Sequence, residues 1–301
     1  MKSIVKNCLL ALIIFVCPLA AKHTYQLSIG MMFRDEAPYL KEWIEFHRLV
    51  GVEHFYLVNN KSVDNYLTIL KPYIRQGIVT LLQEEEDTPI GWGHIQIKAS
   101  NKILSRATGQ TKWLAFLDAD EFLVPTQEES LVEILTEYED FGGVYVFWQN
   151  FGTSYVERIP TNALLIESLT MQADIENYWN HWGKSIVRPE RIASCNLHFH
   201  WYKKPFFHVD TKKQRIPDFD SFDGQDLTII PTFPIDISRM RINHYWTRAT
   251  EDFHRVKIDR LKRWGSPVDK LLEKAASFNH HHDATIARFI KPLKTRLSIT
   301  T

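Results

Sequence analysis

The order of strand-like and helix-like segments in residues 25–124 constrains the fold more than any other feature of this sequence. Mostly apolar runs suited to β-strands alternate there with segments whose apolar residues recur at helical spacing. The strand-like runs cover residues 25–33, 53–60, 77–82 and 113–117. Because strands joined through helices run parallel with right-handed crossovers, this order predicts an α/β fold with a mixed, mostly parallel central sheet flanked by helices.

Three carboxylates follow the fourth run directly. Residues 113–117 are apolar without alternation, as expected for a strand covered on both faces, and Asp118, Ala119, Asp120 and Glu121 come next. In open α/β sheets, ligands bind beyond the carboxyl ends of the strands. Asp118 and Asp120 would point the same way in an extended segment and could share one cation, and hard oxygens suit Mg²⁺ or Mn²⁺. The alternative is a solvated polar turn that closes the strand.

Polar residues also follow the first two strand-like runs. Arg34, Asp35 and Glu36 follow the first run, and the second ends in Asn-Asn-Lys-Ser-Val-Asp at 59–64. Neither loop has the glycine pattern of a Rossmann or Walker phosphate site. Asn, Asp and Arg side chains at adjacent strand ends could bind the base and ribose of a nucleotide, although Asn, Asp and Ser are also common turn residues.

Composition narrows the class of function. The 301 residues carry 36 basic and 36 acidic side chains, so bulk positive charge cannot drive nucleic-acid binding and no nucleic-acid partner is expected. Apolar residues make up 45% of the chain, which is enough for a large core. The many aromatic residues suit core packing and would equally suit stacking against sugar rings.

The segment 1–21 has the pattern of a targeting sequence. Its lysines lie near the start, an apolar stretch covers residues 8–16, and small residues follow. This stretch is shorter than the ~20 residues that span a bilayer, which favours a signal peptide, with a short membrane anchor as the alternative. We therefore expect an exported, secretory-pathway or membrane-associated protein with one domain at 22–301.

Beyond the carboxylates the regular alternation is lost. Residues 126–246 contain short strand-like segments separated by loops, and one of them, 163–170, carries Glu167. Residues 247–301 show helical spacing, so the C-terminus is predicted to be helical. The His-His-His-Asp segment at 280–283 lies between predicted helices and is expected to be an exposed turn outside the site.

Four sequence blocks, considered together with their order and spacing, indicate a known family. They are 33–43, 52–60, 116–122 and the pair His244-Tyr245. Together they resemble the glycosyltransferases of the family 92 (DUF23) group and their bacterial glycosyltransferase-2-like relatives, over about residues 27–262. The resemblance implies the A-type glycosyltransferase fold, a single Rossmann-like domain. Its nucleotide-binding half would lie at about 25–125, its acceptor half at about 126–246 and its C-terminal helices at about 247–301.

The same resemblance implies roles for the two polar loops. Arg34 and Glu36 would lie at the nucleotide, and Asn60 and Asp64 would lie near its base or ribose. The second block usually ends in Asp-Asn in this group, whereas here it ends in Asn59 and Asn60. A carboxylate contact to the base or ribose is therefore in doubt.

The resemblance also implies a metal site and a diphosphate site. Asp118 and Asp120 would be the Asp-x-Asp pair that holds Mn²⁺ or Mg²⁺, and His244 is the candidate third ligand, although a lone strand histidine is as often structural. Lys184 or Arg188 could add a cationic contact to phosphate, or could simply be surface charges.

The predicted reaction is metal-dependent transfer of a sugar from a nucleotide-diphospho-sugar donor to a glycan, glycoconjugate or other hydroxyl acceptor, with inversion. Inversion requires a carboxylate that takes the acceptor proton, and Glu157, Glu167, Glu176 and Asp210 could serve. Glu167 is the preferred candidate because a short apolar strand would fix its position. Two alternatives stay open: a non-enzymatic sugar- or nucleotide-binding protein on the same fold, and a metal-dependent phosphohydrolase that uses the Asp pair.

Overall fold

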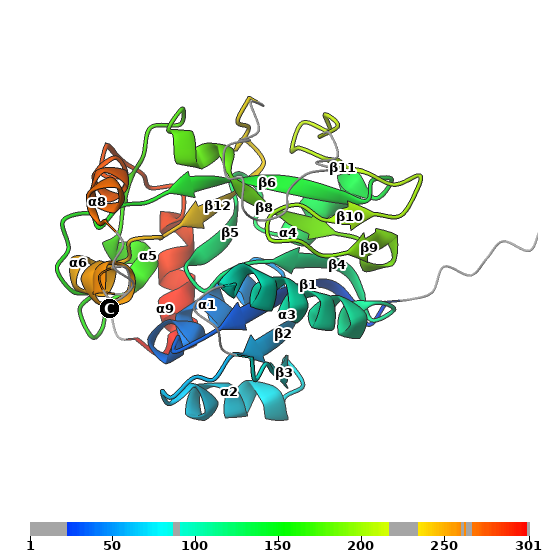
Figure 1. The fold of residues 1–301 in the computed structure, drawn as a ribbon, viewed down its shortest axis with the longest axis horizontal. Helices are drawn as coiled ribbons and strands as arrows, with labels where there is room; N and C mark the ends of the chain where they lie inside the picture. The colour runs from blue at the N-terminus through cyan, green and yellow to red at the C-terminus, as the bar shows by residue number, and fades with distance from the viewer. Residues whose placement is uncertain (1–22, 87–90, 217–233, 260–261, 263–266, 300–301) are drawn as a thin grey trace, which may run out of the picture.

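The computed structural model describes residues 23–86, 91–216, 234–259, 262 and 267–299 (Figure 1). The predicted signal peptide or anchor at 1–21 lies outside the described residues. In the described part of the chain, no helix combines the length and apolar character needed to cross a membrane.

The N-terminal part alternates strands and helices as predicted. In order, its elements are β1 (Tyr25–Phe33), α1 (Ala37–Leu49), β2 (His54–Asn59), α2 (Tyr66–Arg75), β3 (Val79–Gln83), α3 (Trp92–Ala107) and β4 (Thr111–Phe116). β3, β2, β1 and β4 lie side by side in that order and are parallel. The strands are mainly apolar, and core clusters lie on both faces of the sheet. Ile29 and Met31 pack in the core cluster that includes α1, whereas Met32 packs with Ile103 of α3.

The second part completes the sheet with shorter elements. They are β5 (Glu121–Pro125), α4 (Leu131–Leu135), β6 (Gly143–Asn150), α5 (Leu165–Ser168), β7 (Met171–Gln172), β8 (Gly183–Val187), β9 (Ile192–Ser194), β10 (Trp201–Tyr202), β11 (His208–Val209) and β12 (Met240–His244). The sheet continues from β4 through β8, β6 and β12 to β5, and β11 pairs with β6. β8 and β5 run antiparallel to their neighbours, whereas β12 is parallel to β6. The predicted mixed, mostly parallel α/β sheet is confirmed.

The sheet curls, and the turn that carries the carboxylates connects β4, in the middle of the sheet, with β5 at its end. Only residues 117–120 separate β4 from β5, yet β8, β6 and β12 lie between these two strands in the sheet. Helix α1 bonds to β5: Trp43 Nε1 donates to the carbonyl of Glu121 (2.8 Å), and the Leu123 amide donates to His47 Nε2 (3.1 Å). The curl therefore brings β5 back against the first helix.

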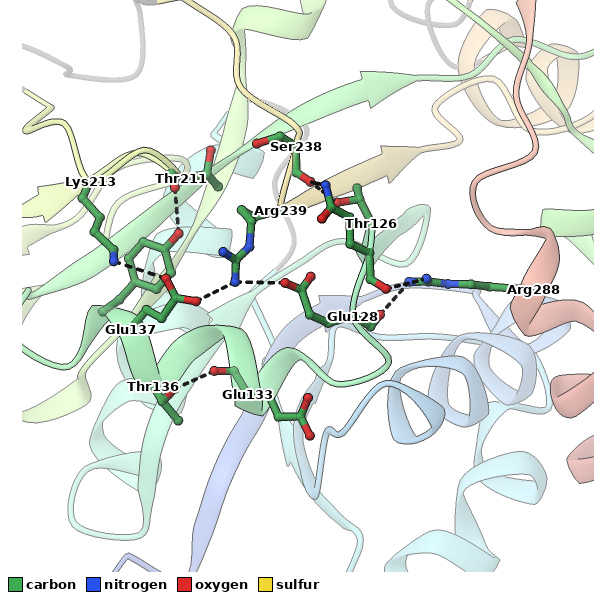
Figure 2. Close-up of polar contacts among 12 residues, drawn as sticks. Thr126, Glu128, Glu133, Thr136, Glu137, Thr211, Lys213, Ser238, Arg239 and Arg288 are labelled. Atoms are coloured by element: carbon green, nitrogen blue, oxygen red, sulfur yellow. Dashed lines mark hydrogen bonds and ion pairs between the residues drawn. The ribbon is translucent and has the colours of Figure 1, made fainter.

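The C-terminal part is mainly helical, as predicted. It contains α6 (Thr250–Asp252), the π-helix η4 (Phe253–Ile258), α8 (Asp269–Ala276), the 3₁₀ helix η5 (Ala287–Phe289) and α9 (Ile290–Leu297), and α9 packs on α1. Arg288 joins this part to the end of β5 and the residues after it. Its guanidinium donates to the carbonyls of Pro125 and Gln127 and to the carbonyl of Glu128 (Figure 2).

Two local predictions are wrong. The segment 163–170 is not a strand, because residues 165–168 form the short helix α5. Its first amides, those of Leu165 and Ile166, donate to the carboxylate of Glu42 on α1 (2.9 and 3.1 Å), which satisfies the helix start. The histidines of the segment 280–283 are exposed as expected, whereas Asp283 is largely buried against Arg241. The segment is not only a turn, because it contains the two-residue strand β13 (His281–His282), which pairs with β7.

Candidate active site at the end of β4

The turn at residues 117–120, called the carboxylate turn below, follows β4 and is held by the buried carboxylate of Glu121. The amide of Asp118 donates to Glu121 Oε2 (2.8 Å), and the amide of Glu121 donates to the carbonyl of Asp118 (3.1 Å). From β12, the amide of Tyr245 donates to the carbonyl of Asp120 (2.8 Å). Glu121 has no exposed surface, and burial raises its pKa to about 8 against the opposing effect of Lys184. The backbone of the turn is thus held by Glu121 at the start of β5 and by Tyr245, the residue after β12.

Lys184 of β8 supplies the positive charge beneath this turn. Its Nζ lies 2.8 Å from Asp118 Oδ2 and 3.9 Å from Glu121 Oε1. Burial opposes the charged form of Lys184, but Asp118 and Glu121 outweigh that effect and raise its pKa. Gln96 of α3 donates to the other oxygen of Asp118 (2.8 Å). Both oxygens of Asp118 therefore have protein donors, and Lys184 is too deeply buried to serve as an open phosphate contact.

Asp120 has a different environment, which fits a cation. Its oxygens lie 3.7 Å from His244 Nε2 and 3.7 Å from Lys257 Nζ, both beyond hydrogen-bonding distance. His244 packs against the ring of Trp148, with centroids 4.2 Å apart, and burial lowers its pKa well below the ordinary value. The imidazole is therefore neutral, as a metal ligand must be. Its Nδ1 is buried without a hydrogen-bond partner in the described structure.

The structure brings Asp120 and His244 together but leaves Asp118 turned toward Lys184. Among the described residues, the ligand atoms of Asp118, Asp120 and His244 do not form a group within 4.8 Å of one another. Asp120 and His244 are therefore the better-placed pair for a cation. Asp118 could serve as a third ligand only if its side chain turned away from Lys184.

The loops after β1 and β2 lie side by side, as predicted, and bond to each other. Arg34 Nε donates to the carbonyl of Asn60 (2.7 Å), and Asp64 accepts from the amide of Ala37 at the start of α1 (2.7 Å). Asn60 Nδ2 donates to the carbonyls of Glu84 and Glu86, while its Oδ1 is buried without a partner among the described residues. These contacts give Asn60 and Asp64 structural roles in shaping the loops.

Glu36 connects the first loop to the chain after β12. Its carboxylate accepts from Arg248 (2.6 Å), whose guanidinium also lies 4.1 Å from the centroid of the Tyr39 ring. The hydroxyl of Tyr39 in turn donates to Asp252 in α6. Burial raises the pKa of Glu36 while Arg248 opposes the rise. Residues more than 200 positions apart in the sequence thus meet beside Asp120, which also raises the pKa of Glu36.

Two predicted site residues do not reach this turn. Arg188 follows the far end of β8, where it lies 5.3 Å from the ring of Trp113 at the start of β4. Glu167 accepts from Lys294 of α9 (2.6 Å) and from the amide of Leu164 at the start of its own helix (3.4 Å). The carboxylate of Glu167 is occupied by structural contacts, so the geometry gives no support to its role as base.

Sequence reasoning missed two lysines beside Asp120. Lys257, on the π-helix η4, has its Nζ 3.7 Å from Asp120 and 5.1 Å from the ring of Trp246. Lys274, on α8, lies over the rings of Trp179 (3.7 Å) and Trp246 (4.1 Å). Burial and the neighbouring Lys257 lower the pKa of Lys274 to about 7. The available signal was the charged helical segment that follows His244-Tyr245.

Comparison with known proteins identifies the family. The model "Glycosyltransferase family 92" matches residues 23–291. The galactan β-1,4-galactosyltransferase GALS3 of Arabidopsis thaliana is 38% identical over 200 residues, covering 59% of this chain and 37% of that protein. The β-1,4-galactosyltransferase galt-1 of Caenorhabditis elegans is 28% identical over 192 residues, covering 59% and 43%. This chain therefore matches less than half the length of either relative.

The crystal structure of S. aureus TarS residues 1–349 shares 15% identity with this chain. The match has a TM-score of 0.36 and covers 55% of this chain and 47% of that one, which is too weak to support an argument. The family match, by contrast, spans most of the chain, including the loops after β1 and β2, the carboxylate turn and β12. The chain belongs to glycosyltransferase family 92.

Proposed function

We propose that this protein transfers a sugar from a nucleotide-diphospho-sugar to a hydroxyl group of a glycan or glycoconjugate, with Mn²⁺ or Mg²⁺ at Asp120. The observation that carries the proposal is the environment of Asp120. One largely buried carboxylate faces a neutral imidazole, His244, and a lysine, Lys257, without hydrogen-bonding to either. This arrangement suits a bound cation and an anionic ligand together.

Each group beside the turn has a defined part in this proposal. Asp120 and His244 would hold the metal, and Asp118 would complete the set. When bound, the metal acts as a Lewis acid toward the departing diphosphate. Lys257 and Lys274 are the side chains placed to contact phosphate oxygens, and Lys184 keeps Asp118 oriented. Arg34 and Glu36 remain candidates for nucleotide contacts at the adjoining loop.

The names of two relatives support both a donor and a stereochemical outcome. Both are β-1,4-galactosyltransferases, and a β product from an α-linked nucleotide-sugar requires inversion at the anomeric carbon. An inverting reaction needs a base beside the acceptor hydroxyl, and Glu167 stays a candidate only if its contact with Lys294 opens. UDP-galactose is therefore the first donor to test.

The test is nucleotide release by the purified protein with UDP-, GDP- and CMP-linked sugars, with and without Mn²⁺. We expect release from one donor class, stimulated by Mn²⁺. Asp120→Asn should lower kcat/KM at least about 100-fold, by the several kcal/mol that charge stabilisation typically supplies. Asp140→Asn is the matched control, since Asp140 is exposed and lies between α4 and β6.

The outcomes separate this proposal from its alternatives. Donor binding that is insensitive to both Mn²⁺ and Asp120→Asn would exclude the metal site. Binding without release on any acceptor would favour a non-enzymatic binding protein. Attack of water on the diphosphate, which releases a nucleoside monophosphate and a sugar 1-phosphate with no transfer to a glycan, would favour a phosphohydrolase.

A further inference from the structure

A second group of metal-ligand side chains lies outside the carboxylate turn. Asp174, just after β7, has its Oδ2 2.8 Å from His280 Nδ1, and its Oδ1 contacts His281 Nε2. One ligand atom from each residue lies within 4.8 Å of the others. In the part of the chain that the structure describes, no other group of three His, Cys, Asp or Glu residues meets this condition. All three side chains are exposed, so a solvated ion can reach them.

Paired backbone segments hold these ligands in place. The amide of His280 donates to the carbonyl of Gln172 (3.0 Å), and His281 pairs with Gln172 across the antiparallel strands β13 and β7. The carbonyl of Asp174 accepts from Nδ2 of the fully buried Asn180 (2.8 Å). The chain bends at His280, so two consecutive histidines point at the same carboxylate instead of at opposite faces.

We propose that Asp174, His280 and His281 form a binding site for a borderline divalent transition metal of the Zn²⁺ type. Two imidazole nitrogens and one carboxylate are ligands that Zn²⁺, Cu²⁺ and Ni²⁺ accept, whereas Mg²⁺ and Ca²⁺ prefer oxygen ligands alone. Three protein ligands leave a position for water. The site is chemically distinct from the oxygen-rich turn at Asp118 and Asp120.

Metal at this site would link two segments that border the candidate active site. The segment after β7 carries Asn177 and Trp179, and the segment before β13 carries Lys274 and Ser277. Asn177 Nδ2 donates to Ser277 Oγ (3.1 Å), and Lys274 lies 3.7 Å from the centroid of the Trp179 ring. A bound ion adds a further link between these segments. Because it binds only the folded arrangement, it raises the unfolding temperature as its concentration rises.

The test is a calorimetric titration of the untagged, chelator-treated full chain with ZnCl₂. In an Asp120→Asn background, which removes the proposed catalytic metal site, we expect one saturable site, with a dissociation constant about tenfold or more higher when His280→Gln or His281→Gln is added. His282→Gln is the matched control, because alternation along β13 places His282 on the opposite face from His281. Asp120→Asn should retain the Zn²⁺ site, which distinguishes it from the proposed catalytic metal.

A second readout counts the nitrogen ligands. With Cu²⁺ in place of Zn²⁺ in the same Asp120→Asn background, the nitrogen hyperfine pattern in electron paramagnetic resonance should fit two imidazoles, and one imidazole when either histidine is replaced. In the Asp120→Asn background, no saturable Zn²⁺ binding, or binding that survives the double variant His280→Gln/His281→Gln, overturns the proposal. An equal loss in His282→Gln also overturns it. Unfolding curves recorded in chelator establish that each variant is folded.

Discussion

Lys184 is the residue on which the charge balance of the carboxylate turn depends. It lies beneath the turn with 4% of its surface exposed, bonded to Asp118 and close to Glu121. A cation placed between two carboxylates contributes little net stability when the whole group is replaced, but its removal alone leaves the acids uncompensated. The position therefore tolerates paired substitutions better than single ones.

Lys184→Met should lower the free energy of unfolding by about 2–3 kcal/mol in urea denaturation at pH 7. This is less than the ~3–5 kcal/mol typical of a fully buried pair, because the Asp118 side chain is 36% exposed and solvent screens its charge. The double variant Lys184→Met/Asp118→Asn should recover part of the loss, because it also removes the carboxylate that Lys184 contacts directly. Equal destabilisation in the single and double variants would contradict this account of the turn.

At the scale of elements, strand β8 carries Lys184. Gly183, the first residue of β8, determines how closely this strand packs against β6. A Cβ added to Gly183 would lie 2.0 Å from the carbonyl oxygen of Val146 on β6, a contact that only a backbone shift can relieve. Gly183 therefore lets β8 pair closely with β6. The register of this strand pair determines where the Lys184 side chain lies relative to the turn.

Gly183→Ala should destabilise the protein by about 3 kcal/mol, at the upper end of the cost of overpacking, and should reduce donor turnover by displacing Lys184. Gly93→Ala is the control, because its Cβ would meet only the end of the Leu197 side chain at 3.3 Å and alanine favours the helix α3. Thermal unfolding of both variants measures the difference. Similar melting temperatures for the two would contradict the prediction.

Arg288 contributes more to anchoring the C-terminal helices than the nearby ion pairs of Arg239 do. Arg288 donates to three backbone carbonyls at the end of β5, whereas Arg239 forms ion pairs with Glu128 and Glu137 (Figure 2). Arg288→Ala should cost about 1–2 kcal/mol in urea unfolding, and Arg239→Ala less than about 1 kcal/mol. A larger loss in Arg239→Ala would reverse this ranking.

The elements that the sequence predicts well are those whose partners are close in sequence. The apolar runs of β1, β2 and β4 read as buried strands because helices cover both of their faces. Helix α5 was missed because a short apolar run is ambiguous and the carboxylate that satisfies its first amides comes from Glu42, more than 120 residues earlier. Lys257 and Lys274 were missed for the same reason, since only the closed sheet brings them to Asp120.

At the scale of the whole molecule, buried neutral histidines make stability depend on pH. Burial lowers the pKa of His47 to about 3 and that of His200 to about 3, whereas an unfolded histidine titrates near ~6.5. Below that value the unfolded state binds the extra protons, so these contributions are complete above pH ~6.5 and are lost as the pH falls. Glu42 acts in the opposite sense, because burial raises its pKa to about 7 and its contribution is lost as the pH rises through that value.

His47→Gln should flatten the pH dependence of the unfolding free energy by about 1.4 kcal/mol per pH unit between pH ~6.5 and ~4. Comparison with the wild type cancels the other titrating groups, including Glu42. His282→Gln is the control, since His282 is exposed and should leave the slope unchanged. Urea unfolding at several pH values gives both slopes, and parallel wild-type and His47→Gln curves would contradict the prediction.

The curl of the sheet has a consequence for synthesis on the ribosome. β5 leaves the ribosome directly after β4, but its sheet partner β12 ends at His244, 119 residues after Pro125. At about 5–20 residues per second, translation of that interval takes roughly 6–24 s. During this interval, the strand Glu121–Pro125 lacks its sheet partner β12. Asp120 also lacks its neighbour His244. The carboxylate turn is synthesised early, but its neighbours from β12 are synthesised much later. A nascent chain can therefore form its first sheet strands long before it can bind a donor.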